Sequence, residues 1–293
     1  MKDFDEIYQN LYNKWNISLE NHRKKSLLRT IIIPIILILV GIILTFITKQ
    51  LIFLCICVVI VLLNAVFSKS KKQYINEFKQ KIIKGFVKQY SDSLTFEAQS
   101  GIPGSNYTRA EFERYDNYYT EDLITGQLEN GYFVNMAEVK TELEMTDEEG
   151  HKTRTKIFHG LFTDVTLDKK IDTCVKIRKD VIDLYKKDKV EMDSGVFEKI
   201  YNVYSKSKII TMQLLTADIM QLLIDFKEKN KITPEITIKQ NHLYIRFATG
   251  KMFEGKLIKS ALDYDTLQEY YNIINFTLDL TKKFITNIKN TEL

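Results

Sequence analysis

The sequence predicts an α+β protein. An N-terminal two-helix transmembrane hairpin comes first, and a cytosolic antiparallel sheet covered by helices follows, with a long helix at the end. Two uncharged apolar runs near the start, strand-like alternation from about residue 121 and a closing helical repeat carry this prediction. At 293 residues the chain has room for one sizeable domain with attachments, and its formal net charge of +4 is too small to indicate nucleic acid as a partner.

Residues 30–48 and 51–67 make up the predicted transmembrane hairpin, residues 30–67. Each run is almost wholly apolar and approaches the roughly 20 residues that a helix needs to cross a bilayer. A signal peptide would begin nearer the N-terminus, whereas here the polar segment 1–29 comes first. Acidic or basic side chains within a membrane span usually mark a transport path. The two runs contain none, so we interpret the hairpin as an anchor in the lipid bilayer.

The charged flanks predict the orientation of the hairpin. Lysine and arginine residues gather before the first run and after the second, whereas the connecting turn holds only Lys49. By the positive-inside rule we expect a multi-pass protein of the cell membrane with both termini in the cytoplasm.

Amphipathic helices are predicted on both sides of the hairpin. The first lies within residues 1–29, and the second, rich in lysine, covers residues 68–92 and continues the second run. Its lysines either lie near anionic headgroups or form a solvated face. Residues 93–120 then contain a glycine and proline break and a short helix that Asn106 or Thr108 would cap, so we interpret them as a linker.

The remaining residues, 121–293, form the predicted cytosolic α+β domain. Its first two strands meet at Asn130-Gly131, a dipeptide that suits a tight two-residue turn. This register sets Leu128 opposite Phe133. We therefore expect the domain to begin with an antiparallel hairpin.

A second hairpin is expected around a turn at residues 148–150, with Gly150 in the left-handed conformation. Its register brings opposite charges together across the strands. The expected pairs are Glu142 with Lys156, Leu143 with Thr155, and Glu144 with Arg154. Continued further, the register places His159 opposite Val139, and Gly160 marks a bulge or the close approach of another backbone.

Later elements complete the domain. Strands are expected at residues 173–177 and 197–213, followed by a helix that begins at Thr216. A hairpin with Gln240 and Asn241 in its turn comes next. The sheet could close into a small barrel of the pleckstrin-homology kind, with the last helix at one end.

The last helix repeats apolar residues in alternating steps of four and three from Leu267 to Ile288. This narrow seam is typical of helix packing. It either docks on the domain's own sheet or pairs with a second copy of the chain.

The polar residues form no recognisable catalytic, cofactor-binding or metal site. His159 has no carboxylate or cysteine partner nearby in the sequence, and the other histidines fall in a basic flank and in turns. Cys55, Cys57 and Cys174 have neither the spacing of a metal knuckle nor the even number of a disulfide scaffold, which favours reducing surroundings. We therefore expect neither a cofactor nor a metal.

Several short motifs together resemble a bacterial family known as domain of unknown function 3137. The matching residues are Glu121-Asp122 with Gly126, Glu138-Val139, Phe158 through Phe162, Leu215-Thr216, Tyr244-Ile245 and Phe253-Glu254. The resemblance spans nearly the whole chain, although Ala217 replaces the usual proline after the capping threonine. It implies the hairpin and the α+β domain but no chemistry, because the family has no established activity.

We expect a membrane-anchored, non-enzymatic binding or scaffold module at the inner face of the membrane. Its partner would be a protein, a lipid headgroup or a second copy joined through the last helix. The rival hypothesis is an enzyme that acts on a membrane-proximal substrate, and convergence of its candidate residues in one pocket would favour it. These candidates are Asp122, Glu138, His159 and Glu254. A third hypothesis is that the protein is a channel or transporter accessory subunit. It requires the hairpin to oligomerise around a water-filled pore.

Overall fold

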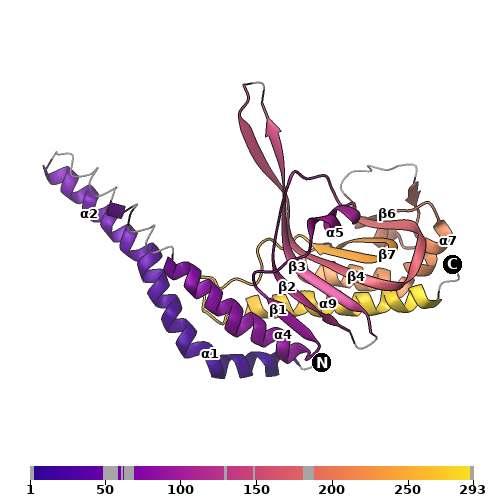
Figure 1. Cartoon of the computed structure of the whole chain (residues 1–293), viewed down its shortest axis with the longest axis horizontal. Coiled ribbons are helices and arrows are strands. Elements are labelled where there is room, and N and C mark those ends of the chain that lie inside the picture. Colours follow the sequence, from indigo (N-terminus) through magenta and orange to yellow (C-terminus); the bar gives the residue numbers. More distant parts are fainter. Residues whose placement is uncertain are drawn as a thin grey trace. The chain divides into compact units, whose positions relative to one another are not determined.

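The computed structural model describes most of the chain (Figure 1). The described residues are 3–48, 59–60, 62, 69–128, 131–147, 149–180 and 188–290. The second predicted span, residues 51–67, lies almost entirely outside them. The chain divides into two compact units, the first formed by residues 1–91 and 253–268 and the second by residues 92–252 and 269–293.

The first unit contains the N-terminal helices. α1 (Phe4–Leu27) continues through a short π-helical stretch, η1 (Leu28–Ile32), into α2 (Ile33–Thr48). The helix Phe4–Ile47 is long and apolar enough to cross a membrane. Residues 69–78 are also helical and lead into η2 (Lys79–Ile83) and α4 (Lys84–Tyr90).

Helix α1 lies beside the helical residues 69–78. The Ser26 hydroxyl lies 3.1 Å from that of Ser70, and both residues are buried. His22 and Lys81 both contact the carboxylate of Glu77. The apolar side chains that these helical segments bury include Ile7, Leu11, Phe78, Ile82 and Phe86.

The second unit is built on an antiparallel sheet, which confirms the predicted α+β class. Its strands are β1 (Leu94–Glu97), β2 (Asn117–Gln127), β3 (Phe133–Thr146), β4 (Lys152–Lys179), β5 (Lys189–Val190), β6 (Tyr201–Tyr204) and β7 (Glu235–Phe247). The pairing order is β1-β2-β3-β4-β6-β5, and β7 also pairs with β4. Among the described strands the order ends at β1 and β5 without a pairing between these two, so the described sheet is open.

Helices lie on both faces of this sheet (Figure 1). They are α5 (Gly104–Arg109), α6 (Gly195–Glu198), α7 (Lys208–Leu214), α8 (Ala217–Asn230) and α9 (Tyr264–Asn290). On one face Tyr107 of α5 packs against Phe162 and Tyr244 in an aromatic core. On the other, Phe276 of α9 stacks on Phe226 of α8 with ring centroids 3.8 Å apart.

The β3–β4 hairpin has the predicted register near its turn. The pairs Glu142 with Lys156, Leu143 with Thr155, and Glu144 with Arg154 all form. A bulge between Thr141 and Glu142 then shifts the register by one residue, so the prediction that His159 lies opposite Val139 is wrong. His159 lies opposite Lys140 instead.

The first hairpin is confirmed with a register one residue away from the prediction. Gln127 pairs with Phe133, and the Leu128 amide donates to the Tyr132 carbonyl over 2.8 Å. Asn130, the first residue of the predicted turn, lies outside the described residues.

Three other local predictions need correction. Residues 235–247 are one strand that pairs with β4 along its length, so the hairpin at Gln240 and Asn241 does not form. Residues 208–214 are helical because the Ser207 side chain accepts the Ile210 amide and caps α7. Finally, β1 lies within the expected linker and pairs with β2. The predicted helix after Thr216 is present as α8.

Candidate functional site

The register shift between β3 and β4 brings His159 next to a buried carboxylate, because β4 carries one extra residue, Ile157, opposite Thr141 and Glu142. Neighbouring side chains of a strand point to opposite faces, so a shift of one residue changes which side chains share a face. His159 thereby joins the face of Glu138, whereas Val139 and Phe158 lie in the aromatic core on the other side. The His159 Nε2 atom lies 2.8 Å from Glu138 Oε1.

Both carboxylate oxygens of Glu138 are engaged. The second oxygen accepts the backbone amide of Met252 over 2.8 Å, and the Glu138 residue is only 3% exposed. Hydrogen bonding at both oxygens offsets much of the cost of burying a charged group. The carboxylate therefore fixes the orientation of the imidazole, whose side chain retains 18% exposure.

His159 opens onto a cavity of about 590 Å³. The residues that line it are Tyr119, Thr120, Glu121, Glu138, Lys140, Lys156, His159 and Lys251. Burial, together with the positive charges of Lys156, Lys140 and Lys251, lowers the pKa of His159 below its ordinary value. The imidazole is thus mainly neutral near pH 7 and donates its Nε2 proton to Glu138.

Chemically, this arrangement offers two capabilities. A neutral imidazole oriented by a carboxylate can accept a proton, as a general base does. Three lysines around the same cavity can bind an anionic group. The sequence shows each of these residues, but it gives no local sign of the bulge that brings them together.

The other two residues of the enzyme hypothesis do not join this cluster. Asp122 is fully buried in β2, where its backbone adopts φ of +61° at a register shift, and its amide donates to the Ala98 carbonyl over 3.3 Å. It does not line the cavity. Glu254 belongs to the first unit. The structure therefore pairs Glu138 with His159 and leaves Asp122 and Glu254 out.

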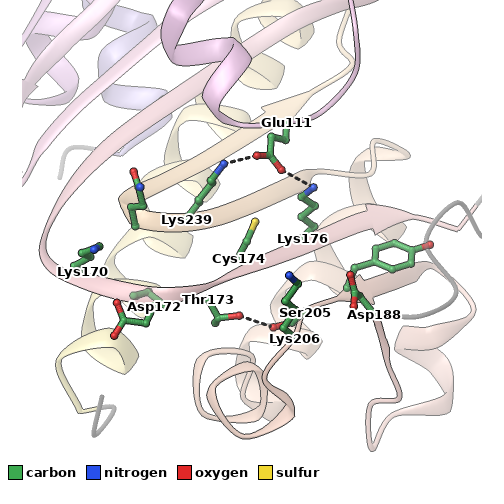
Figure 2. Close-up of a pocket in the computed structure, with 13 residues that line it drawn as sticks. Glu111, Lys170, Asp172, Thr173, Cys174, Lys176, Asp188, Ser205, Lys206 and Lys239 are labelled. Carbon is green, nitrogen blue, oxygen red and sulfur yellow. Dashed lines mark hydrogen bonds and ion pairs between the residues drawn. The ribbon is translucent and has the colours of Figure 1, made fainter.

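A second cavity, of about 510 Å³, lies where β4 and β7 bend (Figure 2). Lys176 and Lys239 reach from neighbouring strands to the carboxylate of Glu111, and the Lys176 ion pair measures 2.7 Å. The two lysines lower the pKa of Glu111. Burial raises the pKa of Cys174 in the same cavity, so its thiol is a weak nucleophile at neutral pH.

A partly buried charge network anchors the segment after α5 to the sheet. Arg246 contacts Glu113 and donates to Glu235 over 2.7 Å. The guanidinium groups of Arg246 and Arg178 lie 4.3 and 4.5 Å from the ring centre of Phe112, within the range of a cation–π interaction. The sequence gives no signal for this network, because its members are far apart along the chain. We interpret the network as structural.

Among the described residues, no group of three or more histidine, cysteine, aspartate or glutamate side chains could hold a metal ion. The cysteines at positions 55 and 57 lie outside those residues. Polar side chains converge at each of the two cavities above.

Comparison with known proteins gives a match to one family model but no activity. No curated protein matches the sequence significantly. A crystal structure of the mycobacterial trehalose monomycolate transport factor A, TtfA, aligns over 62% of this chain and 86% of its own, with 10% identity and a TM-score of 0.33. A likeness of that degree carries no argument about function. Residues 156–285, however, match the family described as a protein of unknown function, DUF3137. This match confirms the resemblance of the sequence motifs to that family over residues 156–285.

Proposed function

We propose that this protein is a membrane-tethered, non-enzymatic binding module whose second unit lies at the cytoplasmic face. The surface of α2 carries this proposal. Large apolar side chains cover it, from Val40 at 44% exposure to Phe46 at 88%. The others are Ile35, Ile36, Ile38, Leu39, Ile42, Ile43 and Ile47. Because apolar surface costs about 25 cal/mol per Å² in water, a helix of this kind is stable when lipid covers it.

The contact between Ser26 and Ser70 supports the hairpin. Both residues are buried and lie side by side, so the chain between them leaves this point and returns to it. Half of the intervening segment is about 21 residues, which as a helix rises about 32 Å. That length matches the roughly 30 Å of the hydrocarbon core of a bilayer.

The charges near the contact support the orientation. Lys24, Lys25 and Arg29 precede the apolar run, and Lys71 and Lys72 follow Ser70. Basic residues stay preferentially on the cytoplasmic side. We therefore propose that both helices enter the membrane from the cytoplasm and that only the turn near Lys49 reaches the outside.

Cysteine labelling in intact cells tests this topology. In a background with the three native cysteines replaced by serine, Lys49→Cys should react with a membrane-impermeant maleimide before the cells are permeabilised. Lys206→Cys, at an exposed position of the second unit, is the matched control and should react only afterwards. The reverse pattern, or a Lys49→Cys protein that reacts only after permeabilisation, would contradict the proposed topology.

The binding role needs a surface that the fold leaves accessible. The seam of α9 is largely covered, since Ile274, Leu278 and Ile285 are at most 3% exposed. Pairing of two copies through this seam would require α9 to leave its own unit. We therefore propose that binding uses the cavities of the second unit instead.

An enzyme remains the second candidate, favoured by the Glu138 and His159 pair at a cavity. If the imidazole acts as a general base, His159→Gln should abolish turnover of whichever substrate a screen identifies, with little change in its binding. Glu138→Gln should lower the rate less and shift its pH dependence. Turnover that survives His159→Gln would remove this candidate.

A further inference from the structure

We infer that the cavity around His159 binds the phosphate group of a small anionic ligand. This inference rests on the proposed binding role and names the ligand class. Cationic side chains from three separate segments line the cavity. Lys140 comes from β3, Lys156 from β4, and Lys251 from the turn that follows β7.

The balance of charges favours an anion. Three lysines line the cavity, compared with two carboxylates. Glu138 is turned inward, where His159 and the Met252 amide occupy its oxygens. Glu121 lies 3.7 Å from Lys251, a long ion pair that a closer anion could replace.

Lys140 and Lys251 each form an ion pair with a carboxylate, whereas Lys156 is exposed to solvent. Lys140 contacts Glu142, which lies outside the lining of the cavity. Lys156 is exposed at the cavity rim. The pKa of His159 is lowered by burial and then by all three lysines, as expected where the local potential is positive.

The size and the donors of the cavity suit a phosphate group. A volume of about 590 Å³ lies within the range of small-molecule sites. Lysines from three separate segments line the cavity, and the hydroxyl-bearing residues Tyr119 and Thr120 line the same space. A phosphate has three or more acceptor oxygens and up to two negative charges, so it can accept from several of these groups together.

The Glu111 cavity shows the contrasting arrangement (Figure 2). There the two lysines on neighbouring strands already bind a carboxylate of the same chain. An anion would have to displace Glu111 before it could bind them. This cavity therefore supplies a matched control of similar volume and similar lysine content.

Titration of the full-length protein with pyrophosphate tests the inference. The protein is held in phosphatidylcholine nanodiscs, and binding is measured by calorimetry and by ³¹P NMR. Each charge-assisted hydrogen bond contributes about 1.5 to 3 kcal/mol, so Lys156→Gln should weaken binding about tenfold or more. Lys156→Gln combined with Lys251→Gln should weaken it further.

Lys206→Gln, which removes an exposed lysine that lines the Glu111 cavity, is the control and should leave the affinity unchanged. Thermal unfolding verifies that each variant is folded. Absence of pyrophosphate binding by the wild-type protein would overturn the inference. An equal loss of affinity in the control would also overturn it, because binding would then reflect general charge.

Two further readouts identify the source of the ligand and separate this inference from the proposed function. If a lipid headgroup fills the site, phosphatidic acid in the nanodiscs should weaken pyrophosphate binding by competition, whereas an unchanged affinity supports a soluble ligand. Appearance of an orthophosphate resonance that His159→Gln abolishes would support the site but overturn the non-enzymatic role.

Discussion

Gly160 of β4 lies directly against the backbone at the end of β7. A Cβ atom at this position would lie 1.9 Å from the Phe247 carbonyl oxygen and 2.8 Å from the Thr249 amide nitrogen. Both obstacles are backbone atoms, which cannot rotate away as the end of a side chain can. Only glycine therefore permits this pairing, and the neighbouring His159 depends on the same local geometry.

Gly160→Ala should lower the free energy of unfolding by about 3 kcal/mol, because the added methyl group forces β4 and β7 apart. Urea denaturation in detergent measures this change. Gly195→Ala is the matched control, since no heavy atom lies within 4 Å of its added Cβ, and its effect should stay within about 0.5 kcal/mol. Equal effects in both variants would contradict the close approach at Gly160.

Glu235 stabilises the fold through the partly buried guanidinium of Arg246. Burial alone would raise the pKa of Glu235, but Arg246 and Arg178 outweigh it and hold the pKa below its ordinary value. The folded protein therefore binds a proton at this carboxylate less readily than the unfolded chain does. This contribution to stability is complete above the unfolded pKa and disappears as the pH falls through the folded one.

Glu235→Gln should destabilise the protein by about 3 kcal/mol at neutral pH, because Arg246 keeps its charge in a partly buried place without this partner. The variant should also lose less stability than the wild type when the pH falls below about 4. Denaturation at both pH values measures the two effects. Glu191→Gln, at an exposed carboxylate, should change neither, and the same acid sensitivity in the Glu235 variant and the wild type would contradict the assignment.

At the scale of elements, α9 completes the core of the second unit. Its Phe276 ring stacks on Phe226 and meets Phe247 edge-on, which joins two helices to the central sheet. Near its end, Asn287 donates to the Leu214 carbonyl over 3.1 Å. The helix is therefore part of the fold rather than an attachment to it.

Phe276→Ala should cost about 4 kcal/mol of stability, because it leaves a cavity between both helices and the sheet. Thr286→Ala, at an exposed position of the same helix, should have little effect. Thermal or chemical unfolding of the two variants compares them directly. If Phe276→Ala proved as stable as Thr286→Ala, α9 would not carry the core in the way described.

Of two hairpins that the sequence pattern predicts, the one between β3 and β4 forms and the one around Gln240 does not. The β3–β4 pairs near the turn follow from the charge pattern, and the structure has them. The pattern around Gln240 also predicts a hairpin, yet β7 continues through this point with Gln240 at φ of +53°. β4 bends alongside it, with register shifts between Thr166 and Cys174. Pairing with the long, bent strand β4 therefore keeps β7 extended, although the local turn preference around Gln240 favours a hairpin.

At the scale of the whole molecule, the chain joins a lipid-compatible helix to a polar α+β unit. Helix α1 and the helical residues 69–78 lie side by side where Ser26 contacts Ser70. This contact belongs entirely to the first unit. It gives the proposed hairpin a direct structural test.

Ser26→Cys together with Ser70→Cys should form a disulfide on mild oxidation in native membranes, after the native cysteines are replaced by serine. The hydroxyls lie 3.1 Å apart, so small adjustments bring the two thiols within bonding distance. Ile17→Cys with Ser70→Cys is the control, because Ile17 is 80% exposed on the same helix. Gel mobility under non-reducing conditions reports the bond, and equal bonding in both pairs would contradict the helix pairing.

The sequence by itself determined the α+β class, the apolar helix near the N-terminus, the register near the tip of the β3–β4 hairpin and the resemblance to the family. Each of these follows from local periodicity, from pairing across a short turn or from short motifs in order. The tertiary structure decided that His159 meets Glu138 and that Arg246 meets Glu113 and Glu235. One extra residue in a strand reverses the face of every later side chain, and the partners in a partly buried network are distant along the chain. Neither effect has a local signature, because both depend on the packing of segments that the sequence keeps apart.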